Sequence, residues 1–497
     1  MVRKITTIIS IVILLSFALG LFSCVKKEEN TTIEDPSLNI NYNTRNWITN
    51  SKTEFDENKI VLSFAALADT HQEMGNEAKA QRLIKVINLA KQYAGGYLDA
   101  VTVSGDMTNK TDRNATNRQN DILQFKSAIE GAVDVKETTV VYSLGNHDND
   151  PQYTNVDEMS KIPAMFKEKL GEDYFRNDID EGPNGSRHAV VNGFHFIACN
   201  PVYYWRPDGY GQELKTWLLE TLVDITSKDP NKPIFILGHA PEYDTVIRSS
   251  YETWYDKDLD EIMRNFPQVV FISGHMHDVL QDERCIVQKD YTCITTGSIH
   301  DENIDWVSES DMNLKINNRS SYGNKVSNTT CQCILIEVDE NNNIRVTRID
   351  GNMDGGNGST VKEPWYISAP QNDLSHLIPY SREYRTSTNT IPEFKGGVTL
   401  SVSQLSDSQV KFTIPAATDD DMIHYYRLEV NIAGSDMLTH QYYLSPFMLF
   451  YKSASEMTNP IDFIATDFIK GETYEIRVYA VDIWGAESAP LVYTITI

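Results

Sequence analysis

The feature that most constrains this fold is a regular alternation of short apolar runs with amphipathic stretches, from Lys59 to about Ala240. Short apolar runs between polar residues are typical of buried strands, whereas apolar residues at intervals of three and four predict helices. Residues 77–93 follow the second spacing, so we expect a helix there. Strands that alternate with helices in this way indicate an α/β domain.

Five apolar runs are the candidate central strands of this domain. Helical patterns at 121–133 and 212–228 separate some of them, and strand-rich segments lie between and after them. One of these segments contains Asn192-Gly193, a dipeptide that predicts a tight hairpin. The five runs lie at 61–69, 98–106, 138–148, 233–241 and 269–277.

Each of the five runs ends in a cluster of polar residues. In open α/β sheets, ligands bind at the carboxyl ends of the strands, so we expect these clusters to lie on one rim. The clusters hold five of the eleven histidines in the chain, which makes a chance arrangement improbable. Their chemically useful members are Asp69, His71, Asp106, Asn146, His147, Asp148, His239, His275 and His277.

The last cluster, Gly-His-Met-His-Asp, places two histidines two positions apart. In an extended backbone such residues point to the same side, so both rings can converge on a metal ion. The alternative is a polar loop after a buried strand, and the ligand types at the other strand ends favour the metal site. Mixed nitrogen and oxygen ligands suit Mn, Fe or Zn better than calcium.

The order of these motifs resembles the calcineurin-like metallophosphoesterase family, whose pattern runs D-x-H, GD, GNH[D/E], GH and GHxH. The resemblance covers a domain at 58–350 and implies a four-layer αββα sandwich with two divalent or trivalent metal ions. It implies hydrolysis of phosphate mono- or diesters through a metal-bridging hydroxide, with a small-molecule phosphoester as partner. The implied ligands are Asp69, His71, Asp106 and His277 for one ion, and Asp106, Asn146, His239 and His275 for the other, with Asp106 bridging.

The GNHD motif implies two further roles. In the family its histidine meets the substrate phosphate and protonates the leaving oxygen, which makes His147 a catalytic residue and, with Asn146, a substrate-binding one. The neighbouring acid, Asp148, would orient that histidine and raise its basicity. The alternative for Asp148 is a helix N-cap.

An aromatic segment after another strand is a candidate to line the cleft. Tyr204 and Trp205 could stack on a base or sugar, and Arg206 could pair with a second phosphate. Ordinary loop packing is the favoured alternative for these residues, as it is for a second aromatic group at 251–255. Neither group identifies a substrate.

The N-terminus predicts export. Arg3 and Lys4 precede an apolar run from Ile5 to Phe22, and the run ends in Leu-Phe-Ser-Cys. This ending resembles a bacterial lipobox, so residues 1–24 are expected to be a lipoprotein signal with a lipidated Cys24, and 25–57 a polar tether. The expected product is anchored to a bacterial membrane, in the periplasm or at the cell surface. A membrane-spanning helix is the alternative.

The C-terminal part has a different pattern. After a linker expected at 351–390, short alternating strands fill 391–497, which fits a β-sandwich. The segment YEIRVYAVDIWG resembles a fibronectin type III module, with four apolar residues on one face. They are Tyr474, Ile476, Val478 and Ala480.

Charge and cysteine content narrow the function classes. The formal net charge of −26 argues against nucleic-acid binding through a basic face. Besides Cys24 there are five cysteines, an odd number that cannot all pair, and a hairpin could join Cys285 to Cys293. The alternative function is a surface-anchored binding protein, in which the fibronectin-like module holds glycan or protein beside a vestigial catalytic domain. The complete ligand set argues against a vestigial domain.

Overall fold

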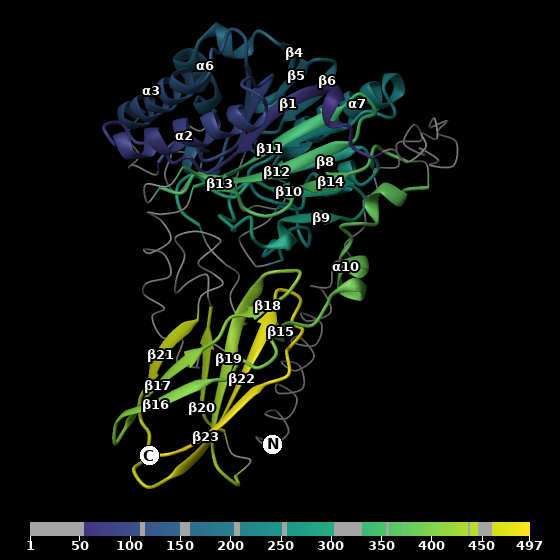
Figure 1. The fold of residues 1–497 in the computed structure, drawn as a ribbon. Helices are drawn as coiled ribbons and strands as arrows, with labels where there is room; N and C mark the ends of the chain where they lie inside the picture. The colour runs from purple at the N-terminus through teal and green to yellow at the C-terminus, as the bar shows by residue number, and fades with distance from the viewer. Residues whose placement is uncertain are drawn as a thin grey trace, which may run out of the picture. The chain divides into compact units, whose positions relative to one another are not determined.

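The computed structural model shows how the elements are arranged (Figure 1). No helix among the described residues is both long enough and apolar enough to cross a membrane. The structure describes residues 54–109, 115–149, 160–202, 209–250, 256–302, 331–353, 357–371, 373–435, 438–445 and 460–497.

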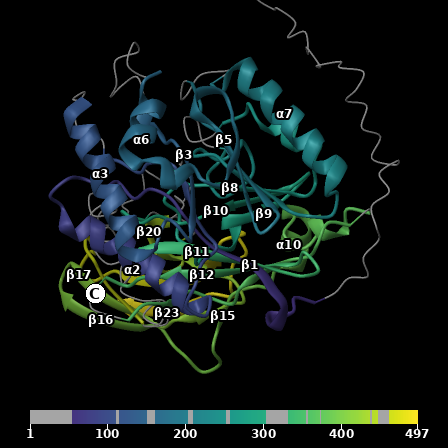
Figure 2. The same ribbon diagram turned by 90° about the horizontal axis from the view of Figure 1, so that it is seen from above.

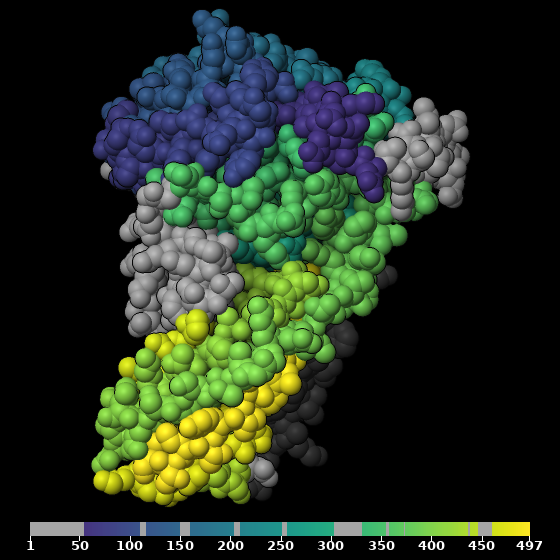
Figure 3. All heavy atoms as spheres, viewed as in Figure 1, coloured from purple at the N-terminus to yellow at the C-terminus, as the bar shows by residue number. Residues whose placement is uncertain are grey.

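The first sheet has seven strands and combines residues from both ends of the α/β domain. Its central strand β1 pairs in parallel with β2 and antiparallel with β11. In the space-filling view, purple N-terminal residues accordingly lie against green residues from much later in the chain (Figure 3). The strands are β1 (Ile60–Leu67), β2 (Ala100–Ser104), β3 (Thr139–Ser143), β11 (Gln332–Asp339), β12 (Ile344–Asp350), β13 (Ser359–Thr360) and β14 (Trp365–Ile367).

The second sheet also has seven strands, in the order β4-β5-β6-β7-β8-β10-β9. The predicted hairpin joins β5 to β6, and Asn192 and Gly193 both have positive φ, 50° and 78°, as a type I′ turn requires. The strands are β4 (Asp178–Glu181), β5 (Arg187–Val191), β6 (Phe194–Ala198), β7 (Ile234–Leu237), β8 (Val269–Ser273), β9 (Ile286–Gln288) and β10 (Thr292–Thr295).

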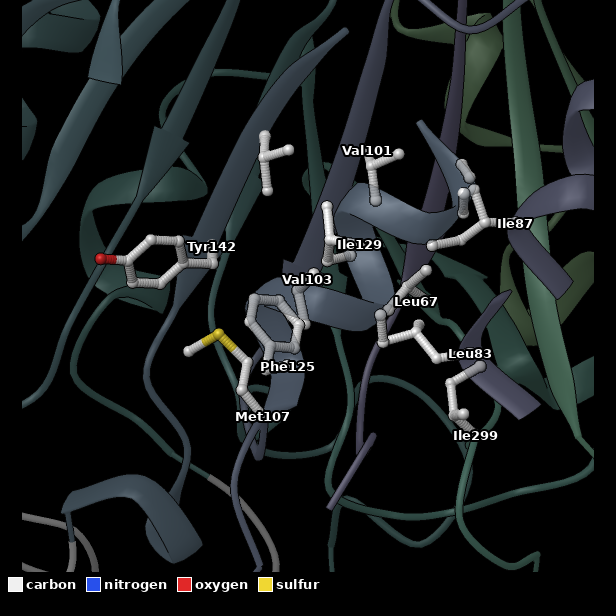
Figure 4. Close-up of a cluster of buried hydrophobic side chains, with 14 of the residues drawn as sticks. Leu67, Leu83, Ile87, Val101, Val103, Met107, Phe125, Ile129, Tyr142 and Ile299 are labelled. Carbon is white, nitrogen blue, oxygen red and sulfur yellow. The ribbon is translucent and has the colours of Figure 1, made fainter. Parts of the chain in front are cut away.

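The two sheets face each other across an apolar core, and helices cover their outer faces. Side chains of β1 point alternately to the two faces of the first sheet. Phe64 points to the second sheet and packs on Phe196 and Phe235, with ring centroids 5.0 and 4.8 Å away. Leu67 faces the helices (Figure 4). Figure 2 shows α7 on the other side of the strands from α2 and α3, which gives the expected αββα sandwich. The larger helices are α2 (Glu77–Tyr93), α3 (Ala115–Ala132), α6 (Ile162–Leu170) and α7 (Gly211–Lys228).

The C-terminal part is all-β. A three-stranded and a four-stranded antiparallel sheet share one core, and a small sheet pairs β15 (Glu393–Phe394) with β18 (Ala417–Thr418). The predicted apolar face of residues 474–480 lies in this core, with all four side chains fully buried. The two larger sheets contain β16 (Ser401–Ser406), β17 (Gln409–Ile414) and β21 (Ile461–Ala465), and β19 (Ile423–Ile432), β20 (Leu438–Leu444), β22 (Thr473–Asp482) and β23 (Leu491–Thr496).

The stretch at 351–390, expected to be a linker, contains regular structure. Its strands β13 and β14 pair with β12, and a helix, α10 (Arg382–Thr388), follows. Trp365 of β14 is buried and donates through its indole nitrogen to Glu283 Oε2 at 2.6 Å. Strands of two and three residues are too short to show a periodic pattern in the sequence.

The cysteine pair that the sequence leaves open does not form a disulfide. The five cysteines of the described residues are buried free thiols. The register of β9 and β10 places Cys293 opposite Val287, so Cys285 lies two positions beyond its would-be partner. That offset exceeds the reach of a disulfide.

Candidate metal centre

The five polar clusters meet at one rim, but they come from two sheets. Strands β1, β2 and β3 of the first sheet and β7 and β8 of the second all end there. Backbone hydrogen bonds join the loops: Asp69 N donates to Gly105 O at 3.0 Å, and Gly274 N donates to His239 O at 2.9 Å. The His239 ring bridges the sheets, because its Nδ1 lies 2.8 Å from Ser104 O. That bond directs Nε2 into the rim.

Asp106 lies in the middle of the cluster. Its Oδ2 is 3.2 Å from His239 Nε2, 3.8 Å from His71 Nε2 and 3.9 Å from His147 Nε2. Its Oδ1 accepts the backbone N–H of His147 at 2.7 Å. Asn146 Oδ1 is 3.0 Å from His239 Nε2, which brings this amide into the same cluster.

Among the described residues, three overlapping groups of side chains each have ligand atoms within 4.8 Å of one another. The first and third are subsets of the two predicted ligand sets, and the second adds His147 to His71 and Asp106. Asp106 belongs to two groups and His71 to two, so the groups form one continuous centre. They are Asp69, His71 and His277; His71, Asp106 and His147; and Asp106, His239 and His275.

The backbone at this rim is strained in the way that functional sites often are. Five of the predicted ligands have positive φ, a conformation that costs a non-glycine residue about 1–3 kcal/mol. The surrounding hydrogen bonds hold these turns in place. His275 and His277 therefore reach the rim from left-handed backbone, and not from the extended backbone that the sequence analysis assumed. The residues are Asp69 (54°), His71 (42°), Asp106 (51°), His275 (68°) and His277 (55°).

Two glycines give the ligands room. A Cβ at Gly145 would lie 2.1 Å from Asp106 Oδ1, and one at Gly274 would lie 2.7 Å from Asp69 Oδ2. Both distances are below 3.0 Å, a separation that real Cβ atoms essentially never show. Glycine is therefore required at these positions because the Asp106 and Asp69 carboxylates pass directly over the backbone.

Burial and the neighbouring carboxylates shift the pKa values of the histidines in opposite directions. Burial disfavours the charged form of His239, but the carboxylates of Asp106 and Asp69 outweigh it and raise its pKa to about 9. The pKa of His277 is raised for the same reason by Asp69 and Asp301, against burial. Burial dominates at His71 and lowers its pKa well below the usual value. The buried carboxylates thus attract positive charge into the rim.

The donor set fits bound cations. Neither ring nitrogen of the buried His71 has a hydrogen-bond partner among the described residues. An unpaired buried polar atom is costly, and an ion at Nε2 would satisfy one of the two nitrogens. Imidazole nitrogens beside carboxylate and amide oxygens are the donors that Mn, Fe and Zn accept. The motif resemblance implies metal ions, and the residues present fit them.

The Asp148 carboxylate holds the loops together. It accepts hydrogen bonds from Met107 N (3.2 Å), Thr108 N (2.9 Å), Thr108 Oγ1 (2.8 Å) and Gly145 N (2.9 Å). The bond to Gly145 resembles a capping box, because Asp148 is the third residue of the short helix α4 (Asn146–Asn149). Burial and the negative charge of Asp106 raise the pKa of Asp148 to about 6. Its bonds therefore clamp the loop that carries Asp106, and its orienting role toward His147 stays a prediction.

His147 occupies the accessible side of the centre. Its ring packs edge-on against His71 with centroids 4.4 Å apart, and its side chain is 21% exposed, whereas that of Asp106 is 2% exposed. A substrate that approaches from solvent would therefore meet His147 before it meets the carboxylate.

A sixth loop, which the sequence reasoning missed, also reaches the rim. It follows β10, which runs parallel to β8, and it contains Ser298, His300 and Asp301. Asp301 Oδ1 lies 2.7 Å from His277 Nδ1, and the His300 ring centroid lies 4.8 Å from that of His71. The signal was present, since the apolar run TCIT is followed by Thr-Gly-Ser-Ile-His-Asp, another strand end with glycine, histidine and aspartate.

Some predicted residues lie outside the described part of the chain. They are the lipidation site Cys24, the cleft candidates Tyr204, Trp205 and Arg206, and the second aromatic group at 251–255.

Comparison with known proteins agrees with this arrangement. Residues 62–279 match the family model of calcineurin-like phosphoesterase. No curated protein sequence matches the chain.

Several solved structures match parts of the chain at low sequence identity. A dimetal phosphatase from Danio rerio has 11% identity and a TM-score of 0.40, and the match covers 63% of this chain and 100% of that one. A purple acid phosphatase from yellow lupin (Lupinus luteus) has 13% identity and a TM-score of 0.40, with 63% of this chain and 55% of that one covered. A fibronectin type III domain of human collagen XX has 11% identity and a TM-score of 0.15, with 20% and 88% covered. At such values, none of these likenesses assigns an activity to this chain.

The family model and the two-sheet sandwich lead to one conclusion: residues 62–279 match calcineurin-like phosphoesterase within an αββα sandwich of the metallophosphoesterase type, and all-β sheets follow it in the chain.

Proposed function

We propose that this chain is an exported, lipid-anchored hydrolase of phosphate mono- or diesters that works with two metal ions. The observation that carries the proposal is the position of Asp106, which shares ligand-atom groups with His71 on one side and with His239 and His275 on the other. A single carboxylate between two clusters of imidazoles is suited to bridge two cations. One ion would be held by Asp69, His71, Asp106 and His277, and the other by Asp106, Asn146, His239 and His275.

The protein's own groups have separate tasks in this reaction. When bound, two ions supply Lewis-acid chemistry, since they acidify a water and neutralise charge that develops at phosphorus. The Asn146 amide adds an oxygen donor without negative charge, which keeps the centre attractive to a phosphate. His147, partly exposed beside Asp106, is placed to contact the phosphate and to give a proton to the leaving oxygen. The Asp148 clamp on Met107 and Thr108 holds the loop of Asp106 in register.

The burial of the predicted ligand side chains supports an enzyme rather than a vestigial domain. His239 is fully buried and Asp106 nearly so, and Asp106 has a strained backbone with a φ of 51°. Strain of this kind persists only where the surrounding structure holds it. A domain that no longer bound metal would gain stability by losing these residues.

The test is hydrolysis by the purified mature chain. We expect turnover of a panel of phosphate mono- and diesters that depends on added manganese, zinc or iron, with about two ions bound per chain by elemental analysis. Asp106→Ala should lose both the ions and the turnover, whereas Asp224→Ala, a change at an exposed position of α7 that pairs with Lys228, should retain them. A wild-type chain that binds ions but hydrolyses no member of the panel would reject the enzymatic proposal.

The proposal places the enzyme at a bacterial membrane, in the periplasm or on the surface. It is supported by the basic residues, apolar run and Leu-Phe-Ser-Cys ending of the first 24 residues. In cells labelled with an alkyne fatty acid, the wild-type chain should take up label and stay with the membrane fraction. Cys24→Ser should remain unlabelled. We further propose that the all-β part is a fibronectin type III-like module, on the strength of its three-plus-four strand arrangement.

A further inference from the structure

The loop after β10 is fixed to both sheets. Thr296 N donates to Ser273 O at 3.1 Å, at the end of β8, and Ile299 N donates to Ala68 O at 3.3 Å, at the end of β1. The buried Arg82 of α2 adds two bonds, from Nε to Ile299 O and from a terminal nitrogen to His300 O, both at 2.7 Å. This loop is therefore a rigid part of the rim, and its side chains have defined positions.

One of those side chains lies directly behind a predicted metal ligand. Asp301 Oδ1 is 2.7 Å from Nδ1 of His277, while Nε2 of the same ring is 3.1 Å from Asp69 Oδ1. The Ser298 hydroxyl helps to fix Asp301, because it accepts the backbone N–H groups of His300 and Asp301 at 3.1 and 3.3 Å. His277 thus has a carboxylate at each ring nitrogen.

The two carboxylates compete for the one proton of a neutral imidazole. If the proton sits on Nε2, the ring donates to Asp69 and presents no lone pair to an ion. If it sits on Nδ1, the ring donates to Asp301 and its Nε2 lone pair faces the rim. Only the second tautomer can bind metal.

We propose that Asp301 is a positioning residue that selects the metal-binding tautomer and orientation of His277. This inference rests on the proposed function, since it assumes that His277 holds an ion. Carboxylates behind metal-bound histidines act in this way in general, and their loss lowers metal affinity by about 10- to 100-fold. No predicted ligand other than His277 needs to change for this effect to occur.

The experiment compares the full mature chain with Asp301→Ala and Asp301→Asn, using Asp224→Ala as the control on α7. Titration with manganese alone should give an apparent Kd about 10- to 100-fold weaker for Asp301→Ala, and an intermediate value for Asp301→Asn, whose amide oxygen still accepts a bond. The thermal midpoint of the metal-free chain should match the control. Binding by Asp301→Ala with the wild-type Kd would overturn the proposal.

A spectroscopic readout separates positioning from general loss of structure. In ¹⁵N-histidine-labelled protein loaded with zinc, a ring N–H donating to a carboxylate gives a downfield proton signal. We expect one such signal in the wild type, its loss in Asp301→Ala and an upfield shift in Asp301→Asn. An unchanged spectrum in both variants would also overturn the inference.

The outcome distinguishes this inference from the proposed function. If the wild type binds two ions and hydrolyses phosphoesters while Asp301→Ala behaves identically, only the role of Asp301 is wrong. If the wild type binds no ions, the proposed function and this inference are both wrong.

Discussion

Oδ2 of Asp106 lies 3.2 Å from Nε2 of His239, although Asp106 follows a strand of the first sheet and His239 follows a strand of the second. The contact therefore spans the interface between the two sheets. Each sheet alone would carry an incomplete set of ligands, so the centre exists only where the sheets are packed together.

Removal of the shared carboxylate should disable the whole centre. We expect Asp106→Ala to lose both ions and to lower hydrolysis by roughly 10³-fold or more, because the residue belongs to both ligand sets. Elemental analysis and turnover of an aryl phosphate measure the two effects. If the variant keeps two tightly bound ions, Asp106 is not the bridge.

A single methyl group at Gly145 should act almost as strongly. In Gly145→Ala the new Cβ would lie 2.1 Å from Asp106 Oδ1 and 2.2 Å from its backbone nitrogen, so the carboxylate must move. We expect manganese affinity to fall by at least about tenfold, as happens when metal-site orientation is disturbed. Gly396→Ala is the matched control, because its Cβ would meet nothing within 4 Å. Equal affinities in the two variants would contradict the expected clash.

The Asp148 clamp should contribute measurably to stability. Asn in its place offers one acceptor oxygen and an NH₂ group that faces donors, so Asp148→Asn should lower the free energy of unfolding by about 1.5–3 kcal/mol. Thr108→Val removes only the hydroxyl donor and should cost about 1 kcal/mol. Both variants should still bind two ions, because no ligand atom is removed. Urea unfolding measures whether Asp148→Asn loses more free energy of unfolding than Thr108→Val. A free energy of unfolding equal to that of the wild type in Asp148→Asn would exclude the clamp.

A histidine pair in the second sheet, with His188 buried and His195 half-buried, should make stability depend on pH. His188 Nε2 lies 2.8 Å from His195 Nδ1, on adjacent strands of the second sheet. Burial, together with the neighbouring His195, lowers the pKa of His188 to about 4 from its usual value of 6.5. The contribution of neutral His188 to the free energy of unfolding is complete above pH 6.5. It is lost as pH falls from 6.5 toward 4, because the unfolded chain binds the proton first.

The variant His188→Gln should remove that dependence. The wild-type free energy of unfolding should fall between pH 7 and pH 4.5 by up to roughly 3 kcal/mol more than that of the variant. Chemical unfolding at several pH values measures the difference. If the free energies of unfolding of the two proteins change with pH in parallel, His188 has the same pKa in the folded and the unfolded chain.

Local sequence patterns predicted the elements that local physics determines. The helix expected at 77–93 has those bounds in the structure, because its apolar spacing and its surroundings agree. The Asn192-Gly193 turn formed because both residues tolerate positive φ. The apolar alternation at 474–480 predicted the buried face correctly, because that strand packs on the core with one face only.

Long-range pairing could not be read in the same way. The five candidate strands looked alike in sequence, and nothing in their composition assigns three to one sheet and two to the other. Similarly, Trp365 lies in a polar stretch without periodicity, and only the tertiary contact with Glu283 explains its burial.

For the site, residue type was informative where several clusters repeated one pattern. The structure brings the seven predicted ligands and His147 to one rim, as the common strand-end position indicated. It shows Asp148 clamping a loop, a contact that its place beside His147 did not suggest. His300 and Asp301 were overlooked because they follow β10, which forms a short hairpin with β9 outside the alternation of strands and helices.

The pairing of β1 with β11 has a consequence for the order of assembly. β1, which ends beside Asp69, is flanked by β2 on one side and by β11, Gln332–Asp339, on the other. Every predicted ligand precedes β11 in the chain, yet the strand that bears the first of them gains its second neighbour only when the far end of the domain arrives. Such distant pairing is slow to form. A nascent chain would thus hold all the predicted ligands without the scaffold that gathers them, so the predicted centre can assemble only after β11 has paired with β1.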